Sequence, residues 1–122
     1  GLGIPAEPLF RSGRAKKICQ EKGGYLATIT SDEENRYIYD YMVKQGYESA
    51  CFGLSDLDDN TWKWINGEKV ECTNWAPGEP NHENNVEHYG MFYWKTKYTW
   101  NDGDFATSTL YGGKAFICEF DE

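Results

Sequence analysis

Oxygen-bearing side chains gather in one stretch of the chain that begins at Glu79 and ends at Asp102. The candidate ligands in it are Glu79, Asn81, Glu87, Asn101 and Asp102. Carboxylate and amide oxygens suit a hard cation such as calcium, whereas softer metals prefer nitrogen and sulfur. Residues 74–87 are too polar to pack a core, and a long loop in a small domain needs something to hold it. We therefore predict a calcium site that braces this loop.

The net charge of the chain is −8, which argues against a nucleic-acid-binding surface because such surfaces need Lys and Arg. An acidic surface suits a protein that collects cations, although the same charge could serve only to keep the domain soluble. No apolar run is long enough to cross a bilayer. The sequence opens without a signal peptide, so we expect a processed chain or an excised domain. With 122 residues, we expect one domain over residues 1–122.

The four cysteines are Cys19, Cys51, Cys72 and Cys118, and no pair has the close spacing of a zinc or redox site. Two structural disulfides and an oxidising compartment are the favoured interpretation. Sequence alone allows three pairings.

The first half of the chain predicts two helices. One begins at Ser12 as its N-cap and ends at Gly23-Gly24. A short strand, residues 25–29, follows. Ser31 and Glu34 form a capping box for the second helix, which carries an apolar stripe and ends at Gly46. The expected members of that stripe are Tyr37, Ile38, Tyr41 and Met42.

From Cys51 the hydrophobic period changes to two, which predicts strands. We expect strands at 51–54, 62–64, 87–94, 98–100 and 115–120. Asn66-Gly67 predicts a hairpin turn, with Val70 and Cys72 on the returning strand. Cys51 and Cys72 would then flank a small antiparallel unit and could meet across it. Helices followed by short strands indicate an α+β fold.

Several motifs together resemble the C-type lectin domain over about residues 12–120. They are Gly23-Gly24-Tyr25-Leu26-Ala27-Thr28-Ile29, Phe52-Gly53-Leu54-Ser55-Asp56, Trp62-Lys63-Trp64, Asn74-Trp75, Glu79-Pro80-Asn81, Trp100-Asn101-Asp102 and Phe116-Ile117-Cys118-Glu119. The resemblance is specific because fold landmarks and sugar-site motifs occur in the same order. It implies a double-loop α+β fold with two helices, small antiparallel sheets, a long calcium-binding loop and a Cys19–Cys118 disulfide.

The resemblance also implies a calcium-dependent carbohydrate site. Glu79, Asn81, Glu87, Asn101 and Asp102 match the ligands of the principal calcium ion, and Asp102 gives both a side-chain and a backbone oxygen. A cis bond before Pro80 would aim Glu79 and Asn81 at one point. The order Glu-Pro-Asn implies mannose-type sugars, namely mannose, fucose, N-acetylglucosamine and glucose, bound through vicinal hydroxyls. Glu79, Asn81, Glu87 and Asn101 would also hydrogen-bond these hydroxyls.

His82 follows that motif and is a candidate sugar contact, with a solvated loop residue as the alternative. Mannose-type glycans on glycoproteins or cell surfaces are the expected partners of an extracellular, secreted or cell-surface protein. We expect no insertion into membranes. One shallow site binds weakly, so several domains in a parent protein would add avidity.

The chain departs from the pattern of this family at several positions. Tyr89 and Phe105 stand where the family's second disulfide is expected, so an aromatic contact is predicted there. We predict that Cys51 and Cys72 bond to each other instead. Asp56 with Asp59 or Asn60 could serve a second calcium ion, although a solvated turn is the simpler interpretation. His82 and His88 stand where that second site needs carboxylates.

Two other classes of function compete with a lectin. A calcium-braced domain of this fold could bind a protein or another surface. An enzyme is disfavoured, because His82 and His88 lack a nucleophile pattern and calcium between Glu79 and Glu87 would block glycosidase chemistry. Trp75 and Trp94 could stack on a sugar, but we expect both in the core.

Overall fold

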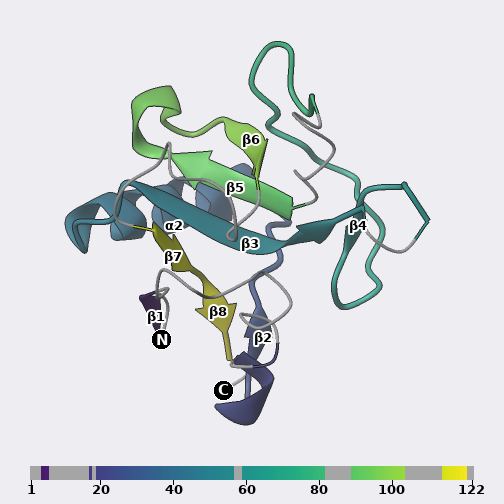
Figure 1. Ribbon diagram of the computed structural model, residues 1–122, viewed down its shortest axis with the longest axis horizontal. Helices are drawn as coiled ribbons and strands as arrows, with labels where there is room; N and C mark the ends of the chain where they lie inside the picture. Colours follow the sequence, from purple (N-terminus) through teal and green to yellow (C-terminus); the bar gives the residue numbers. More distant parts are fainter. Residues whose placement is uncertain are drawn as a thin grey trace.

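The computed structural model describes residues 4–5, 17, 19–56, 59–81, 89–103 and 114–120. One helix packs against one face of the main sheet, which confirms the α+β class (Figure 1). The elements in chain order are β1 (Ile4–Pro5), β2 (Tyr25–Leu26), α2 (Asp32–Lys44), β3 (Ser49–Ser55), β4 (Lys63–Trp64), β5 (Tyr89–Tyr93), the 3₁₀ turn η2 (Trp94–Thr96), β6 (Trp100–Gly103), β7 (Lys114–Phe116) and β8 (Cys118–Glu119).

The main sheet has the strand order β1-β7-β3-β5-β6, and β4 pairs with β3 off that path. Strands β2 and β8 form a separate two-stranded sheet. All pairs are antiparallel except β3 with β7, which run parallel, so the expectation of antiparallel sheets needs this one amendment. Strand β3 lies at the centre, and its residues before Ser55 are all buried.

The first helix is described only at its end, where Lys17 and residues 19–21 are helical. The amide of Gly24 donates to the carbonyl of Cys19 at 2.8 Å, and Gly23 has a positive φ of 88°. This is the glycine-terminated helix end that the sequence predicted. Its predicted start at Ser12 lies outside the described residues.

Helix α2 is capped as predicted at both ends. The hydroxyl of Ser31 accepts from the amide of Glu34 at 3.1 Å, while the Glu34 carboxylate accepts from the amide of Thr30 at 3.1 Å. Burial and the nearby carboxylates Glu119 and Glu68 raise the pKa of Glu34. At the other end, Gly46 takes a positive φ of 86°.

The predicted apolar stripe of α2 is partly wrong. Tyr37 is 62% exposed and Tyr41 is half-buried. The buried residues are Asn35, Ile38, Tyr39 and Met42. Their spacing of three, one and three residues follows one face of a helix, and Tyr37 lies off that face. The sequence pattern missed Asn35 because it is polar.

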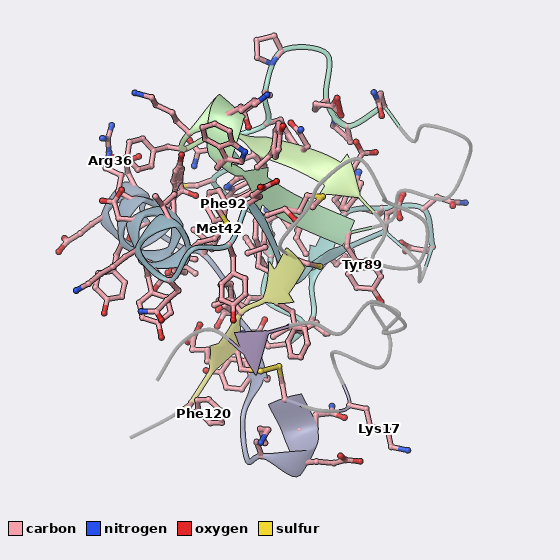
Figure 2. All side chains as sticks on the ribbon, turned by 60° about the vertical axis from the view of Figure 1, so that its left-hand side comes forward. Lys17, Arg36, Met42, Tyr89, Phe92 and Phe120 are labelled. Carbon is pink, nitrogen blue, oxygen red and sulfur yellow. A yellow bond between two sulfur atoms is a disulfide. The ribbon has the colours of Figure 1, made fainter. Side chains whose placement is uncertain are left out.

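Two buried clusters hold the fold together. The larger lies between α2 and the sheet, where Met42 and Phe92 lie (Figure 2). The smaller surrounds the disulfide between Cys19 and Cys118, which joins the first helix to β8 and confirms the pairing that the family resemblance implied. The S–S bond is drawn in yellow in Figure 2.

The predicted strand over residues 115–120 is split in two. At Ile117 the chain leaves the main sheet and joins the small one. The amide of Ile117 donates to the carbonyl of Cys51 at 2.9 Å, and its own carbonyl accepts from Ala27 at 2.9 Å. The strand predicted at residues 25–29 is shorter than expected, because β2 covers only Tyr25–Leu26. The next residue, Ala27, bonds to Ile117, which lies between the two sheets.

The hairpin predicted at Asn66-Gly67 is half right. The turn is present, with Gly67 at φ 86° and the Asn66 side chain accepting from the amide of Glu68 at 2.9 Å. No strand returns from it, because residues 68–74 lack regular structure. The predicted Cys51–Cys72 disulfide is therefore wrong: Cys51 is buried in the core, Cys72 is exposed, and their sulfurs are not bonded to each other.

Two strands near the site differ from the predicted bounds, one by a shift along the chain and the other at its end. Strand β6 begins at Trp100 and continues to Gly103, whereas residues 98–100 were expected. Strand β5 is described from Tyr89, and Trp94 already belongs to the 3₁₀ turn. Tyr89 is buried beside the disulfide, but Phe105, its predicted aromatic partner, lies outside the described residues.

Two serines in this fold should respond in opposite ways to alanine. Within the described residues the buried hydroxyl of Ser49 makes no hydrogen bond, whereas that of Ser31 caps α2. Ser49→Ala should raise the free energy of unfolding by about 1 kcal/mol, because a buried unsatisfied hydroxyl is removed. Ser31→Ala should lower it by about 1 kcal/mol. Chemical denaturation measures both, and an equal sign for the two variants would contradict the hydrogen-bond assignment.

Candidate functional site

The loop that carries Glu79 is fastened to strand β6 at its start. The amide of Trp100 donates to the carbonyl of Asn74 at 2.7 Å, and the amide of Ala76 donates back to the carbonyl of Trp100 at 2.8 Å. Trp75 and Trp100 form a parallel bridge between these bonds. The loop therefore enters the site region alongside the strand that holds Asn101 and Asp102.

A tight turn then brings Glu79 back toward that strand. The amide of Glu79 donates to the carbonyl of Ala76 at 2.9 Å, across Pro77 and Gly78. Gly78 has a φ of 84°, which a turn with proline before glycine requires. The bond between Glu79 and Pro80 is cis, as the family resemblance implied.

Asn81 joins the two halves of the site. Its side-chain amide donates to Oε1 of Glu79 at 3.1 Å, and its backbone amide donates to Oδ1 of Asp102 at 3.1 Å. Asp102 is only 1% exposed and lies opposite Gly90 in the sheet. Asn101, its half-exposed neighbour in β6, lies opposite Met91.

Four of the five predicted ligands thus come from two segments that the fold brings side by side. Glu79, Asn81 and Asp102 are linked by hydrogen bonds, and Asn101 is adjacent to Asp102 in the chain. Glu87, the predicted third carboxylate, and His82 lie outside the described residues. Within the described part, no three His, Cys, Asp or Glu side chains come together as a metal site.

The charges of this site fit a hard cation. Oε2 of Glu79 is buried, and so is the carboxylate of Asp102. Burying negative charge is costly unless positive charge or hydrogen-bond donors compensate for it. The groups available to coordinate a metal ion are carboxylate and amide oxygens, which are the ligands that calcium prefers.

Sequence reasoning missed one residue beside the site. Asn35 of α2 is fully buried; its Oδ1 accepts from the indole Nε1 of Trp100 at 2.7 Å, and its Nδ2 donates to the carbonyl of Tyr98 at 2.9 Å. A polar residue at helical spacing from Ile38 and Met42 was the signal that could have revealed it. Asn35 couples the helix to the strand that carries the site.

The two tryptophans considered as sugar contacts differ. Trp75 is half-buried and packs against Trp62 and Trp100, with ring centroids 4.9 and 5.8 Å apart. Its predicted place in the core is confirmed in part, because it packs against the core but is only partly buried. Trp94 is 44% exposed in η2, with the Lys95 ammonium over its ring, so its predicted place in the core is wrong.

The residues considered for a second calcium ion also differ in their exposure to solvent. Asp59 is exposed and hydrogen-bonded to Lys63 at 2.8 Å, and that bond lowers the pKa of its carboxyl. It behaves as part of a solvated turn. Asp56, in contrast, is buried, with 2% exposure, so the solvated interpretation does not extend to it. His88 lies outside the described residues.

The family comparison agrees with this architecture. The lectin C-type domain matches residues 12–120, and the chain belongs to this family. No helix among the described residues is long and apolar enough to span a bilayer. The fold and the site thus define a C-type lectin domain.

Two proteins of known name are similar to this chain in sequence. A perlucin-like protein of Mytilus galloprovincialis is 40% identical over 92 residues, which are 72% of this chain and 58% of that protein. The secretory phospholipase A2 receptor of Pongo abelii is 33% identical over 109 residues, which are 88% of this chain and 7% of the receptor. The chain therefore spans less than two thirds of either relative.

Two solved structures share the fold. One is the EPNH mutant of CEL-I, a C-type lectin from Cucumaria echinata, at 25% identity and a TM-score of 0.73; the match covers 92% of this chain and 86% of that one. The other is the cow carbohydrate-recognition domain of CD23 in the presence of a GlcNAc2Man3 oligosaccharide, at 27% identity and a TM-score of 0.74, covering 99% and 86%.

Proposed function

We propose that this domain binds carbohydrate in a calcium-dependent manner and has no catalytic activity. The observation that carries the proposal is the pair of hydrogen bonds that Asn81 donates. One goes to the carboxylate of Glu79 in the loop, and the other goes to the carboxylate of Asp102 in β6. Glu79, Asn81, Asn101 and Asp102, with Glu87 from the adjoining segment, would hold the ion. When bound, calcium would supply coordination positions for two vicinal sugar hydroxyls.

The chain's own side chains would then orient the sugar. Carboxylates of Glu79 and Glu87 accept hydrogen bonds from the two hydroxyls, and the amides of Asn81 and Asn101 donate to them. The present Asn81–Glu79 hydrogen bond orients the amide before any sugar arrives. His82 is proposed as an additional contact at the edge of the site.

We propose mannose-type sugars as the preferred class, on the order of the residues Glu79-Pro80-Asn81. The sequence EPNH, by which the CEL-I mutant is known, is also the sequence of residues 79–82 in this chain. The CD23 domain was solved in the presence of an oligosaccharide that contains mannose. A single shallow site would bind in the roughly millimolar range, about 4 kcal/mol.

The proposed setting is extracellular, and the domain 1–122 would act as one carbohydrate-recognition unit. A disulfide in the structure favours an oxidising compartment. Glycans on glycoproteins or cell surfaces would be the partners, and a parent protein with several such domains would gain avidity.

A glycan array run in calcium and again in chelator tests this proposal. Binding to mannose, fucose, N-acetylglucosamine and glucose that disappears in chelator is the expected result. Calcium binding without any glycan signal would instead favour the second candidate function, a calcium-braced domain that binds protein. That candidate has one specific observation behind it, the 33% identity to a receptor named for a secretory phospholipase.

Exchanging the two loop ligands should change the sugar preference. Glu79→Gln combined with Asn81→Asp keeps the net charge and the number of oxygen ligands but reverses which position donates and which accepts. We expect preference to move from mannose toward galactose by about tenfold, equivalent to about 1.4 kcal/mol. Calcium affinity, measured by calorimetry, should stay within about threefold. An unchanged mannose preference would contradict the proposed hydrogen bonds.

A further inference from the structure

We propose that Asn35 of helix α2 is a positioning residue for the site, acting through Trp100 on both segments that carry the ligands. The inference rests on the calcium site proposed above. It adds a residue that would touch neither the ion nor the sugar.

The Asn35 side chain is held at both ends of its amide. It is fully buried, accepts from the Trp100 indole at 2.7 Å and donates to the Tyr98 carbonyl at 2.9 Å. The oxygen and the nitrogen of one amide have different roles, so rotation of the side chain would cost both bonds. A buried donor or acceptor left without its partner costs about 1–3 kcal/mol. Asn35 therefore fixes the start of β6 against the helix.

Trp100 is the residue on which the two halves of the site meet. Its side chain is fully buried, and its own backbone amide and carbonyl are the groups that fasten Asn74 and Ala76 to the strand. The same residue thus bonds to the helix through its indole and to the loop through its backbone. A shift of Trp100 would move both attachments together.

The ligands lie within a few residues of these attachments. In the loop, one turn separates Ala76 from Glu79. In the strand, Asp102 lies two residues past Trp100 and accepts the backbone amide of Asn81. Glu79, Asn81 and Asp102 are consequently held in register by one tryptophan, whose position Asn35 sets.

Preorganised ligands bind more tightly because less order is imposed on binding. If Asn35 is replaced by an apolar residue, the site keeps all of its oxygen ligands but loses part of their fixed arrangement. Residues that orient metal ligands typically contribute 10- to 100-fold in affinity when they hydrogen-bond the ligand itself. Asn35 acts through one further residue, so we expect an effect of about tenfold.

The test compares Asn35→Leu with Tyr39→Phe. Tyr39 lies on the same helix and donates its hydroxyl to the carbonyl of Trp94, in the 3₁₀ turn η2 that joins β5 to β6. Tyr39→Phe therefore removes a hydrogen bond between α2 and the segment that joins β5 to β6, and leaves the bond to Trp100 in place. It controls for a general loss of helix-to-sheet attachment.

Two measurements separate positioning from stability. The first is hydrogen exchange of the Ala76 and Asn81 amides in chelator, relative to amides of β3 that report global opening. The second is the calcium Kd by calorimetry on variants that are fully folded at the temperature used. Asn35→Leu should speed the two amides by about tenfold and raise the Kd by about tenfold. Tyr39→Phe should leave both within about twofold.

Equal effects of the two variants, or no effect of Asn35→Leu, would overturn the positioning role. If Asn35→Leu does not fold, Trp100→Phe breaks the same bond from the strand side and should give the same faster exchange. The exchange measurement needs no calcium. Wild-type protein that binds no calcium would therefore overturn the proposed function, while the response of the Ala76 and Asn81 amides would still decide whether Asn35 positions these segments.

Discussion

Asp102→Asn is expected to abolish calcium-dependent sugar binding, with the calcium Kd raised by at least about 100-fold. Asp102 is buried at the junction of loop and strand, where its Oδ1 accepts the amide of Asn81. The asparagine oxygen can still accept that hydrogen bond. The substitution therefore removes the negative charge and leaves the local geometry largely intact.

Asp59→Asn is the matched control, because it removes the same charge from an exposed turn. Asp59 pairs with Lys63, and both side chains are about half exposed, at 54% and 47%. Exposed pairs of this kind contribute about 0–1 kcal/mol. Calorimetry with calcium and retention on mannose resin measure the two variants. Similar losses in both would mean that net charge, and not the local site, governs calcium binding.

Loss of the Cys19–Cys118 disulfide is expected to destabilise the domain by about 4–5 kcal/mol. The bond closes a loop with a sequence separation of 99, so its removal frees most of the unfolded chain. The double variant Cys19→Ser, Cys118→Ser tests this by denaturant unfolding in chelator. A domain of this size has a total stability of about 5–15 kcal/mol, so the variant could be partly unfolded at 37 °C.

Cys72→Ser separates the disulfide from any general effect of losing sulfur. Cys72 is exposed and is not bonded to Cys51. Its replacement should change the free energy of unfolding by less than about 0.5 kcal/mol. A large loss from Cys72→Ser, or a small loss from the double variant, would contradict the assignment of the stabilising bond.

Features that depend on a few neighbouring residues followed from the sequence alone. The capping box at Ser31, the glycine helix end at Gly46 and the turn at Asn66-Gly67 each rest on local hydrogen bonds and backbone preferences. The family motifs added the Cys19–Cys118 pairing and the cis bond before Pro80, both of which the structure contains. They also supplied the proposed ligand set.

Features that depend on which distant segments meet were decided only by the tertiary structure. Nothing local to Val70 or Cys72 indicates that the chain does not return as a strand there, so the Cys51–Cys72 pairing failed with that strand. Trp94 is apolar by type, yet it lies in an exposed 3₁₀ turn.

The same distinction applies to the site. The sequence by itself determined which oxygen-bearing residues were available, because side-chain chemistry is fixed by residue type. Only the fold decided that residues 74–76 attach to Trp100, that Asn81 bonds to Asp102 across 21 positions, and that Asn35 reaches Trp100 across 65. These contacts join segments far apart in the chain, and their energy is available only once the core between them has formed.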